Sequence, residues 1–180
     1  MLQKHNPKFL YLIPNYQNPT GKIMGKERRN ELIAVASKYE LCIVEDNPYG
    51  ELRFEGEPQP NLLDLSENVI YLGTFSKVLA PGLRVGYIIG DPKVIEFVTR
   101  VKEAVDLHSN NLTQRAVYQY LQRNLLPSHI AKLRTIYKSR RDAMVQALHR
   151  YLEGEVEIIV PSGGMFLWAK FTGIKDSFKY

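Results

Sequence analysis

The sequence GTFSKVLAPGLRVG, Gly73–Gly86, places a lysine between two apolar runs. The runs Val69–Leu72 and Val85–Ile89 flank it, and their length and composition predict two buried strands. Lys77 therefore lies in a turn at the end of a predicted strand. This position is unfavourable for a lysine whose only role is to be a solvated surface charge. Arg84 follows seven residues later, after a Pro-Gly turn.

The residue types around Lys77 suit an anionic or carbonyl-bearing ligand. A lysine amine forms a Schiff base with an aldehyde when desolvation or a neighbouring cation lowers the amine pKa. The hydroxyls of Thr74 and Ser76 and the guanidinium of Arg84 suit a phosphate group. A solvated loop lysine beside a serine is the alternative, and it is the usual situation for a single lysine.

Composition is that of a globular protein with one domain or a large part of one. The chain has 180 residues, of which 44% are hydrophobic and 24% charged, and its net charge is +5. The single cysteine, Cys42, excludes an internal disulfide, which favours a cytoplasmic protein. The first residues lack the apolar core of a signal peptide, and no apolar run reaches membrane-spanning length. Acids are interspersed with the basic residues, so a solvated surface or an anionic small molecule explains the charge as well as nucleic acid does.

Alternating strand and helix patterns predict an α/β fold. Apolar runs predict a buried strand at Phe9–Ile13 and a second strand at Leu41–Glu45. Between them, Leu32, Val35, Ala36 and Tyr39 have the spacing of a helix over Lys26–Tyr39. Strand, helix and strand in this order imply a right-handed parallel crossover. Beyond Ile89, Asp91 suits the cap and Pro92 the first turn of a helix over 91–107, and a polar break follows at residues 108–111. The sequence then predicts helices at 113–123 and 128–152 and strands at 155–160 and 165–171; residues 52–68 are expected to be irregular.

Polar loops follow three of the predicted strands. PNYQNPTG, Pro14–Gly21, follows the first strand, Asp46–Gly50 the second, and the lysine turn the third. In open α/β sheets, ligands bind beyond the carboxyl ends of parallel strands, so we expect the three loops to converge on one pocket. Each polar residue also has a simpler interpretation: a turn former at Asn18 or Asp46, core packing at Tyr49, and a surface ion pair at Arg84.

In this order, the motifs resemble those of the pyridoxal-phosphate (PLP) aminotransferases of fold type I, class I/II. The resemblance rests on PNYQNPTG, on Asp-x-x-Tyr at Asp46–Tyr49, and on Ser-Lys with an arginine seven residues after the lysine. It extends from about Leu10 to Phe171. The segment PSGGMFLW, Pro161–Trp168, is similar to the branch that includes aminoadipate/kynurenine, aromatic and valine-type transaminases.

The resemblance implies a three-layer α/β/α sandwich with a mostly parallel sheet, the PLP-transferase major domain, present in part. Residues 1–126 would be part of the large PLP-binding domain, 127–152 a connecting helix, and 153–180 the start of a small α+β C-terminal domain. Members of the family carry a long segment before PNYQNPTG, and a C-terminal arginine that binds the substrate carboxylate; neither is recognisable here. The chain therefore resembles a fragment, and we expect the isolated 180-residue chain to be weakly active or inactive.

The resemblance also implies an activity in amino acid metabolism and biosynthesis: transfer of an amino group between an amino acid and a 2-oxo acid through a Lys77 Schiff base with PLP. Lys77 would then move the proton between the substrate α-carbon and the cofactor. Asp46 would keep the pyridine nitrogen protonated, so that the ring accepts electrons. Tyr49 and Asn18 would bond the phenolate oxygen of the ring.

The remaining residues of the resemblance concern the phosphate and the partner subunit. Arg84, Ser76 and Thr74 would hold the phosphate, with Thr74 at a position where many relatives have serine. His108 and the loop 109–113 resemble a segment near the subunit interface, and we expect the full-length protein to be a homodimer.

Three other functions compete with the transaminase. The first is an aminotransferase-like effector domain of a PLP-binding transcription regulator, which an upstream winged-helix segment would distinguish. The second is a PLP lyase or decarboxylase on the same fold, which would release ammonia or carbon dioxide. The third is a basic nucleic-acid-binding module, which predicts salt-dependent binding without PLP uptake.

Overall fold

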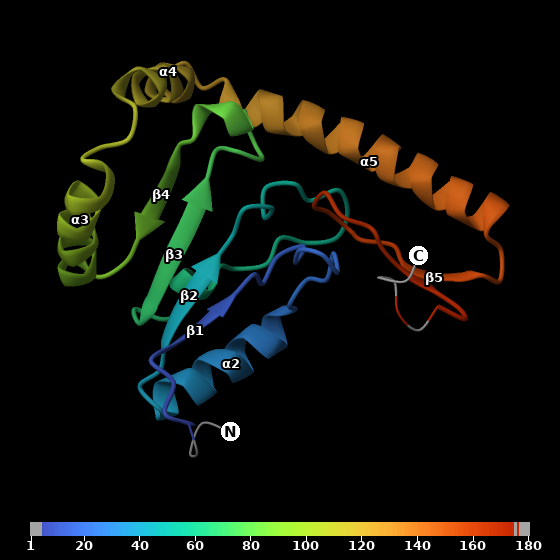
Figure 1. Cartoon of the computed structure of the whole chain (residues 1–180), viewed down its shortest axis with the longest axis horizontal. Coiled ribbons are helices and arrows are strands. Elements are labelled where there is room, and N and C mark those ends of the chain that lie inside the picture. Colours follow the sequence, from blue (N-terminus) through green and yellow to red (C-terminus); the bar gives the residue numbers. More distant parts are fainter. Residues whose placement is uncertain (1–4, 175, 177–180) are drawn as a thin grey trace.

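A four-stranded sheet forms the centre of the computed structural model, which describes residues 5–174 and 176. Its strand order is β1-β2-β3-β4 (Figure 1). The strands β1, β2 and β3 are parallel, and β4 runs antiparallel to β3. The sheet thus confirms the predicted α/β fold with mostly parallel strands. The bounds are Phe9–Leu12 for β1, Cys42–Asp46 for β2, Val69–Thr74 for β3 and Gly86–Ile89 for β4.

The long helix α5, Leu126–Tyr151, extends from the four-stranded sheet toward a second, two-stranded antiparallel sheet (Figure 1). Of the predicted domain parts, residues 1–4, 175 and 177–180 lie outside the described residues. No helix within residues 5–174 is long and apolar enough to cross a membrane. The other elements are α2 (Lys26–Lys38), α3 (Pro92–Asp106), α4 (Asn111–Gln122), β5 (Val156–Ile159), β6 (Trp168–Phe171) and the 3-10 turns η1 (Leu62–Asp64) and η2 (Pro81–Leu83).

Two helix starts depend on local capping. Asp91 accepts a hydrogen bond from the Lys93 amide at 2.8 Å, and a proline follows it, as the sequence predicts for α3. Helix α4 begins two residues before its predicted start because the Asn110 side chain accepts hydrogen bonds from the amides of Leu112 and Thr113. An asparagine cap therefore extends the helix into the segment expected to be a polar break.

Helix α2 covers one face of the sheet, and the main hydrophobic core lies between the helix and that face. Strand side chains alternate between faces, so one set of alternate residues from β1, β2 and β3 points toward this helix. Val35 and Tyr39, which the helical spacing placed on the apolar face, are instead exposed. The buried members are Ala36, Leu41, Ile43, Leu62 and Val69, with Leu10, Leu12, Leu32, Ile33 and Leu63 packed against them.

The opposite face of the sheet is largely open. Phe9, Tyr11 and Ile88 lie on it with 58%, 51% and 42% of their surface exposed. The strands expected at Phe9–Ile13 and Val85–Ile89 are present, but the prediction that they are buried is wrong. Apolar runs indicate a buried strand only when both faces are covered, and the described residues cover one.

Contacts among three segments join the four-stranded sheet to the two-stranded sheet, beside the middle of α5. The Gly164 amide donates to the Leu52 carbonyl at 2.8 Å, and Gly163 forms an isolated bridge with Arg53. A Cβ atom on Gly163 would lie 2.4 Å from the Tyr16 ring, so this turn requires glycine. The Tyr16 side chain is buried beneath this turn.

An ion-pair cluster fastens α5 to this joint. The Glu55 carboxylate accepts hydrogen bonds from Arg141 Nη2 at 2.8 Å and from Nη1 at 3.2 Å, and it lies 3.1 Å from Lys138 Nζ. Arg141 also donates to the Pro161 carbonyl at 2.7 Å. The Arg141 and Lys138 hydrogen bonds hold the pKa of Glu55 down, at about 2.

We expect acid to weaken this joint, because a carboxylate with a lowered pKa stabilises the fold above its ordinary pKa of 4.5 and loses that contribution as the pH falls toward 2. Solvent screening keeps the contribution at about 1 kcal/mol or less. Urea unfolding at pH 7 and at pH 3 measures it. The variant Glu55→Gln should lose less stability between these two pH values than the wild type does.

The matched control is Glu67→Gln, an exposed glutamate without an ion pair among residues 5–174. It should show the acid sensitivity of the wild type. The same acid sensitivity in Glu55→Gln would contradict a stabilising role for the cluster.

Candidate functional site

The three polar loops lie at one edge of the sheet. Parallel strands end on the same side, and β1, β2 and β3 are paired in register, with Tyr11 opposite Val44 and Asp46 opposite Leu72. The ends of these strands and the loops that follow them carry all seven residues predicted for the site: Asn18, Asp46, Tyr49, Thr74, Ser76, Lys77 and Arg84.

Asp46 and Thr74 lie on the same, open face of the sheet. Asp46 pairs with Leu72, and Thr74 is two residues further along β3, so both side chains point to the face that carries Tyr11. One strand spacing, about 4.8 Å, separates them sideways, and two residues, about 6.6 Å, separate them along the strands. A carboxylate and a hydroxyl are thus held at opposite ends of a span of small-molecule size.

Lys77 lies in a helical turn directly after β3. The amides of Leu79 and Ala80 both donate to the Phe75 carbonyl, which forms the turn. The Phe75 amide donates to the Val85 carbonyl at 3.1 Å, so the loop returns to its start. Lys77 is half-buried, and no ion pair to it is present within residues 5–174. Lys77 therefore follows the end of β3 directly, and no carboxylate within residues 5–174 pairs with its amine.

Arg84 closes the same loop. Its backbone is left-handed, with φ at 54°, and its guanidinium donates to the Pro81 carbonyl at 3.2 Å. The expected alternative, an ion pair with a surface acid, does not occur within the described part of the chain. The Ser76 amide donates to the Thr74 hydroxyl at 3.1 Å, which fixes both hydroxyl residues at the strand end. The loop thus presents two hydroxyls and a free cation.

Tyr49 and Asn18 meet beside Asp46. Burial raises the pKa of Tyr49, a hydrogen bond with the Asn18 side chain lowers it, and the Asp46 charge raises it again. The Tyr49 ring also packs edge-on against Phe166 at a centroid distance of 5.5 Å. Tyr49 therefore has both the core-packing role of the simpler interpretation and a hydroxyl directed at the site.

Tyr11 is a site residue that the sequence did not single out. Its hydroxyl donates a hydrogen bond of 2.5 Å to Asp46 Oδ2. This bond is the largest of the effects that raise the pKa of Tyr11 to about 12. The contact crosses from β1 to β2, so only the strand register could have indicated it.

A buried arginine holds the PNYQNPTG loop from below. Arg29 on α2 is fully buried, and it donates to the carbonyls of Met24 at 2.8 Å and Pro60 at 2.9 Å and to the Asn15 side chain at 2.6 Å. Asn15 in turn donates to the Asn47 side chain at 3.0 Å, next to Asp46. Sequence periodicity missed Arg29, because a charged residue on a helix is normally assigned to solvent.

Glu45 is the buried counter-charge of Arg29. The two side chains are fully buried, with Glu45 Oε1 3.9 Å from Arg29 Nη1, and Glu45 Oε2 accepts the Leu63 amide at 3.2 Å. Burial raises the pKa of Glu45, and the backbone bonds of Leu63 and Leu62 oppose this. This pair links α2, β2 and η1 beneath the candidate site.

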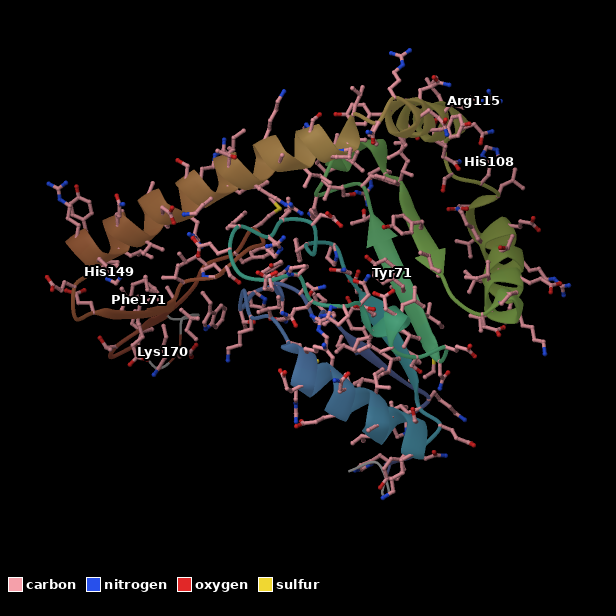
Figure 2. All side chains as sticks on the ribbon, turned by 180° about the vertical axis from the view of Figure 1, so that it is seen from behind. Tyr71, His108, Arg115, His149, Lys170 and Phe171 are labelled. Carbon is pink, nitrogen blue, oxygen red and sulfur yellow. The ribbon has the colours of Figure 1, made fainter. Side chains whose placement is uncertain are left out.

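A cavity of substantial volume lies away from Asp46 and Lys77. A space of about 560 Å³ separates α5 from the segment before β6, and neither Asp46 nor Lys77 lines it. Its walls are mostly apolar and include Phe54, Met144, Leu148 and Phe166. Figure 2 shows His108 on the connection between α3 and α4, away from Tyr71 in the sheet. Thr74 lines a second cavity, of about 360 Å³, between the end of β3 and the start of α5, and neither Asp46 nor Lys77 lines it. The candidate site residues therefore share a sheet edge and not one cavity within the described residues.

Comparison with known proteins shows the family of the chain. The family model "Aminotransferase class I and II" matches residues 2–179. The chain belongs to this aminotransferase family. Its membership confirms the resemblance inferred from PNYQNPTG and the Ser-Lys turn.

Several proteins are similar to this chain. Aromatic-amino-acid aminotransferase 1 of Thermococcus litoralis is 46% identical over 90% of this chain and 39% of its own length. The uncharacterized HTH-type transcriptional regulator YisV of Bacillus subtilis is 37% identical over 94% of this chain and 35% of its own length. A Pyrococcus horikoshii kynurenine aminotransferase, solved in complex with PMP, superimposes with a TM-score of 0.92 at 43% identity over 99% of this chain and 45% of that structure. The chain spans about two fifths of the length of such relatives.

We expect Arg29→Met to destabilise the fold strongly, because it leaves Glu45 buried without its cation. Removing one partner of a buried ion pair costs about 3–5 kcal/mol. Arg28→Met is the matched control on the same helix, since Arg28 is exposed and pairs only with Glu31 there. Its cost should be below about 1 kcal/mol. Urea unfolding of the full-length variants measures both, and equal costs would contradict the clamp.

Proposed function

We propose that the full-length protein is a PLP-dependent aminotransferase that moves an amino group between an amino acid and a 2-oxo acid. The observation that carries the proposal is the single open face on which β2 ends at Asp46 and β3 at Thr74, with Lys77 and Arg84 in the next loop. Family membership supports it, as do the aminotransferase relatives. The chain spans only part of such relatives, so the activity belongs to the whole protein.

The residues present fit the cofactor by their chemistry. PLP, when bound, supplies an aldehyde carbon that bonds to amines and a ring that accepts electrons. The two hydroxyls and the arginine of the Thr74–Arg84 loop suit its phosphate. Asp46, one strand away on the same face, suits the ring nitrogen at the other end.

Lys77 is the catalytic residue of this proposal. Its amine would hold the cofactor through the aldehyde carbon when no substrate is bound. Once released, the same amine would serve as the base that takes the proton from the substrate α-carbon and delivers it at the cofactor carbon. The turn after β3 keeps the amine beside the site throughout.

The other site residues bind the cofactor and adjust the charge on its ring. The Asp46 carboxylate holds a proton on the ring nitrogen by its negative charge. Tyr49 and Asn18 donate hydrogen bonds to the phenolate oxygen of the ring and so stabilise its charge. Arg84, Ser76 and Thr74 hold the phosphate, and Arg84 supplies the positive charge.

We expect borohydride reduction of the full-length protein with PLP to leave one pyridoxyl adduct, on Lys77. Mass spectrometry of the digest locates it. Lys77→Ala should abolish the adduct and lower transamination by at least about 100-fold, which is the contribution of a general base. Lys93→Ala, an exposed lysine on α3, serves as the control and should retain both. Adducts scattered over many lysines would contradict the proposed site.

We propose further that the full-length protein is a cytoplasmic homodimer that acts in amino acid metabolism. Exposed apolar side chains on α3 and α4, among them Phe97, Val105 and Leu112, need cover from other protein. Sedimentation of the full-length protein should give twice the mass of one polypeptide. A monomer with full activity would contradict the dimer.

A second candidate function is the effector domain of a PLP-binding transcription regulator. The likeness to YisV favours it, because that relative is an HTH-type regulator of which this chain matches about a third. A winged-helix segment encoded upstream, together with sequence-specific DNA binding, would support the regulator. Product formation from an amino acid and a 2-oxo acid would support the transaminase.

A further inference from the structure

The Tyr11 side chain makes one polar contact with the candidate site, and it is with Asp46. The hydroxyl of Tyr11 donates to Asp46 Oδ2 at 2.5 Å. Within residues 5–174, Asp46 Oδ1 receives no hydrogen bond, so one carboxylate oxygen is fixed and the other is free. No role in PLP chemistry follows for Tyr11 from the sequence motifs.

Strand register explains why this residue reaches Asp46. Tyr11 pairs with Val44 across β1 and β2, and Asp46 is two residues further on, so both side chains lie on the open face. Side chains on strands lean along the strand, which brings a long phenol to a short carboxylate one step ahead. About half of the Tyr11 surface is exposed, so its hydroxyl is not needed to fill a core.

The contact restricts a group that would otherwise rotate. The terminal torsion of an aspartate is broad, so an unrestrained carboxylate samples many orientations. A hydrogen bond to an ionised group is short and strong, and it fixes the plane of the carboxylate. Because the pKa of Tyr11 is raised to about 12, chiefly by this bond, the phenol stays protonated and remains a donor at neutral pH.

We propose that Tyr11 is a positioning residue, which orients Asp46 so that its free Oδ1 meets the ring nitrogen of the bound cofactor. The inference rests on the proposed function, since it needs a ring nitrogen at Asp46. It adds a residue of β1 to a site that the motifs confine to the three loops. Tyr11 acts only through Asp46 and does not touch the cofactor.

The test is the affinity of the full-length apoprotein for two ligands, measured by fluorescence. One is PLP, and the other is its deaza analogue, in which carbon replaces the ring nitrogen. Tyr11→Phe should weaken PLP binding by about three- to tenfold, as expected for one lost hydrogen bond. It should leave binding of the deaza analogue unchanged, because that ligand offers Asp46 nothing to bond.

Tyr118→Phe is the matched control. Tyr118 is an exposed tyrosine on α4, whereas Asp46 ends β2. It should change neither affinity, and urea unfolding should show equal stability for both variants and the wild type. If Tyr11→Phe lost equal affinity for PLP and for the deaza analogue, the Tyr11 hydroxyl would only support the fold. If it lost affinity for neither ligand, the orientation of Asp46 would not depend on Tyr11. Either result would overturn the inference. No PLP binding by the wild type would overturn the proposed function as well.

Discussion

Strand β2 lies between β1 and β3 and runs parallel to both, and the rest of the site depends on this pairing. The register puts Tyr11, Asp46 and Thr74 on one face and sends Glu45 to the other. On the far side, Glu45 meets Arg29, whose guanidinium ties α2 to the loop after β1. A shift of one residue would exchange the two faces, burying Asp46 and exposing Glu45. The buried pair therefore helps to specify the register that builds the site.

The order of elements was largely readable from the sequence, because it depends on local patterns. The capped start of α3 at Asp91 and the parallel crossover from β1 to β2 both followed from spacing and turn residues. The placement of all three polar loops at one edge followed from that parallel order. Asn110 shows the limit, since its capping of α4 depends on a loop conformation that composition alone did not reveal.

Side-chain contacts between different helices and strands could not be predicted from the sequence. The Tyr11–Asp46 bond needs the cross-strand register, and the Arg29–Glu45 pair places two charges where periodicity expects solvent or core. Exposure was misjudged for the same reason: Phe9 and Ile88 belong to apolar runs, yet they lie on a face that residues 5–174 leave open. Whether a strand is buried depends on what covers it, which its own sequence does not record. The roles of the seven motif residues in binding PLP stay a prediction.

The open face of the sheet agrees with the finding that the chain covers only part of the length of its relatives. The chain covers about two fifths of relatives such as the Thermococcus litoralis enzyme, and its candidate site is an edge with residues on one side only. A site of this kind binds tightly only when further protein encloses the ligand, because burial strengthens every charge interaction within it. We therefore propose that the chemistry takes place at this sheet edge and that the full activity belongs to the complete protein.

A crystal structure of the full-length protein with PLP would test the assignment most directly. We expect the ring nitrogen to lie within hydrogen-bonding distance of Asp46, and the phosphate to lie among Thr74, Ser76 and Arg84, with the ring across the open face between β2 and β3. PLP bound instead in the cavity beside α5, or with its phosphate at Asp46 and its ring nitrogen toward Arg84, would contradict it.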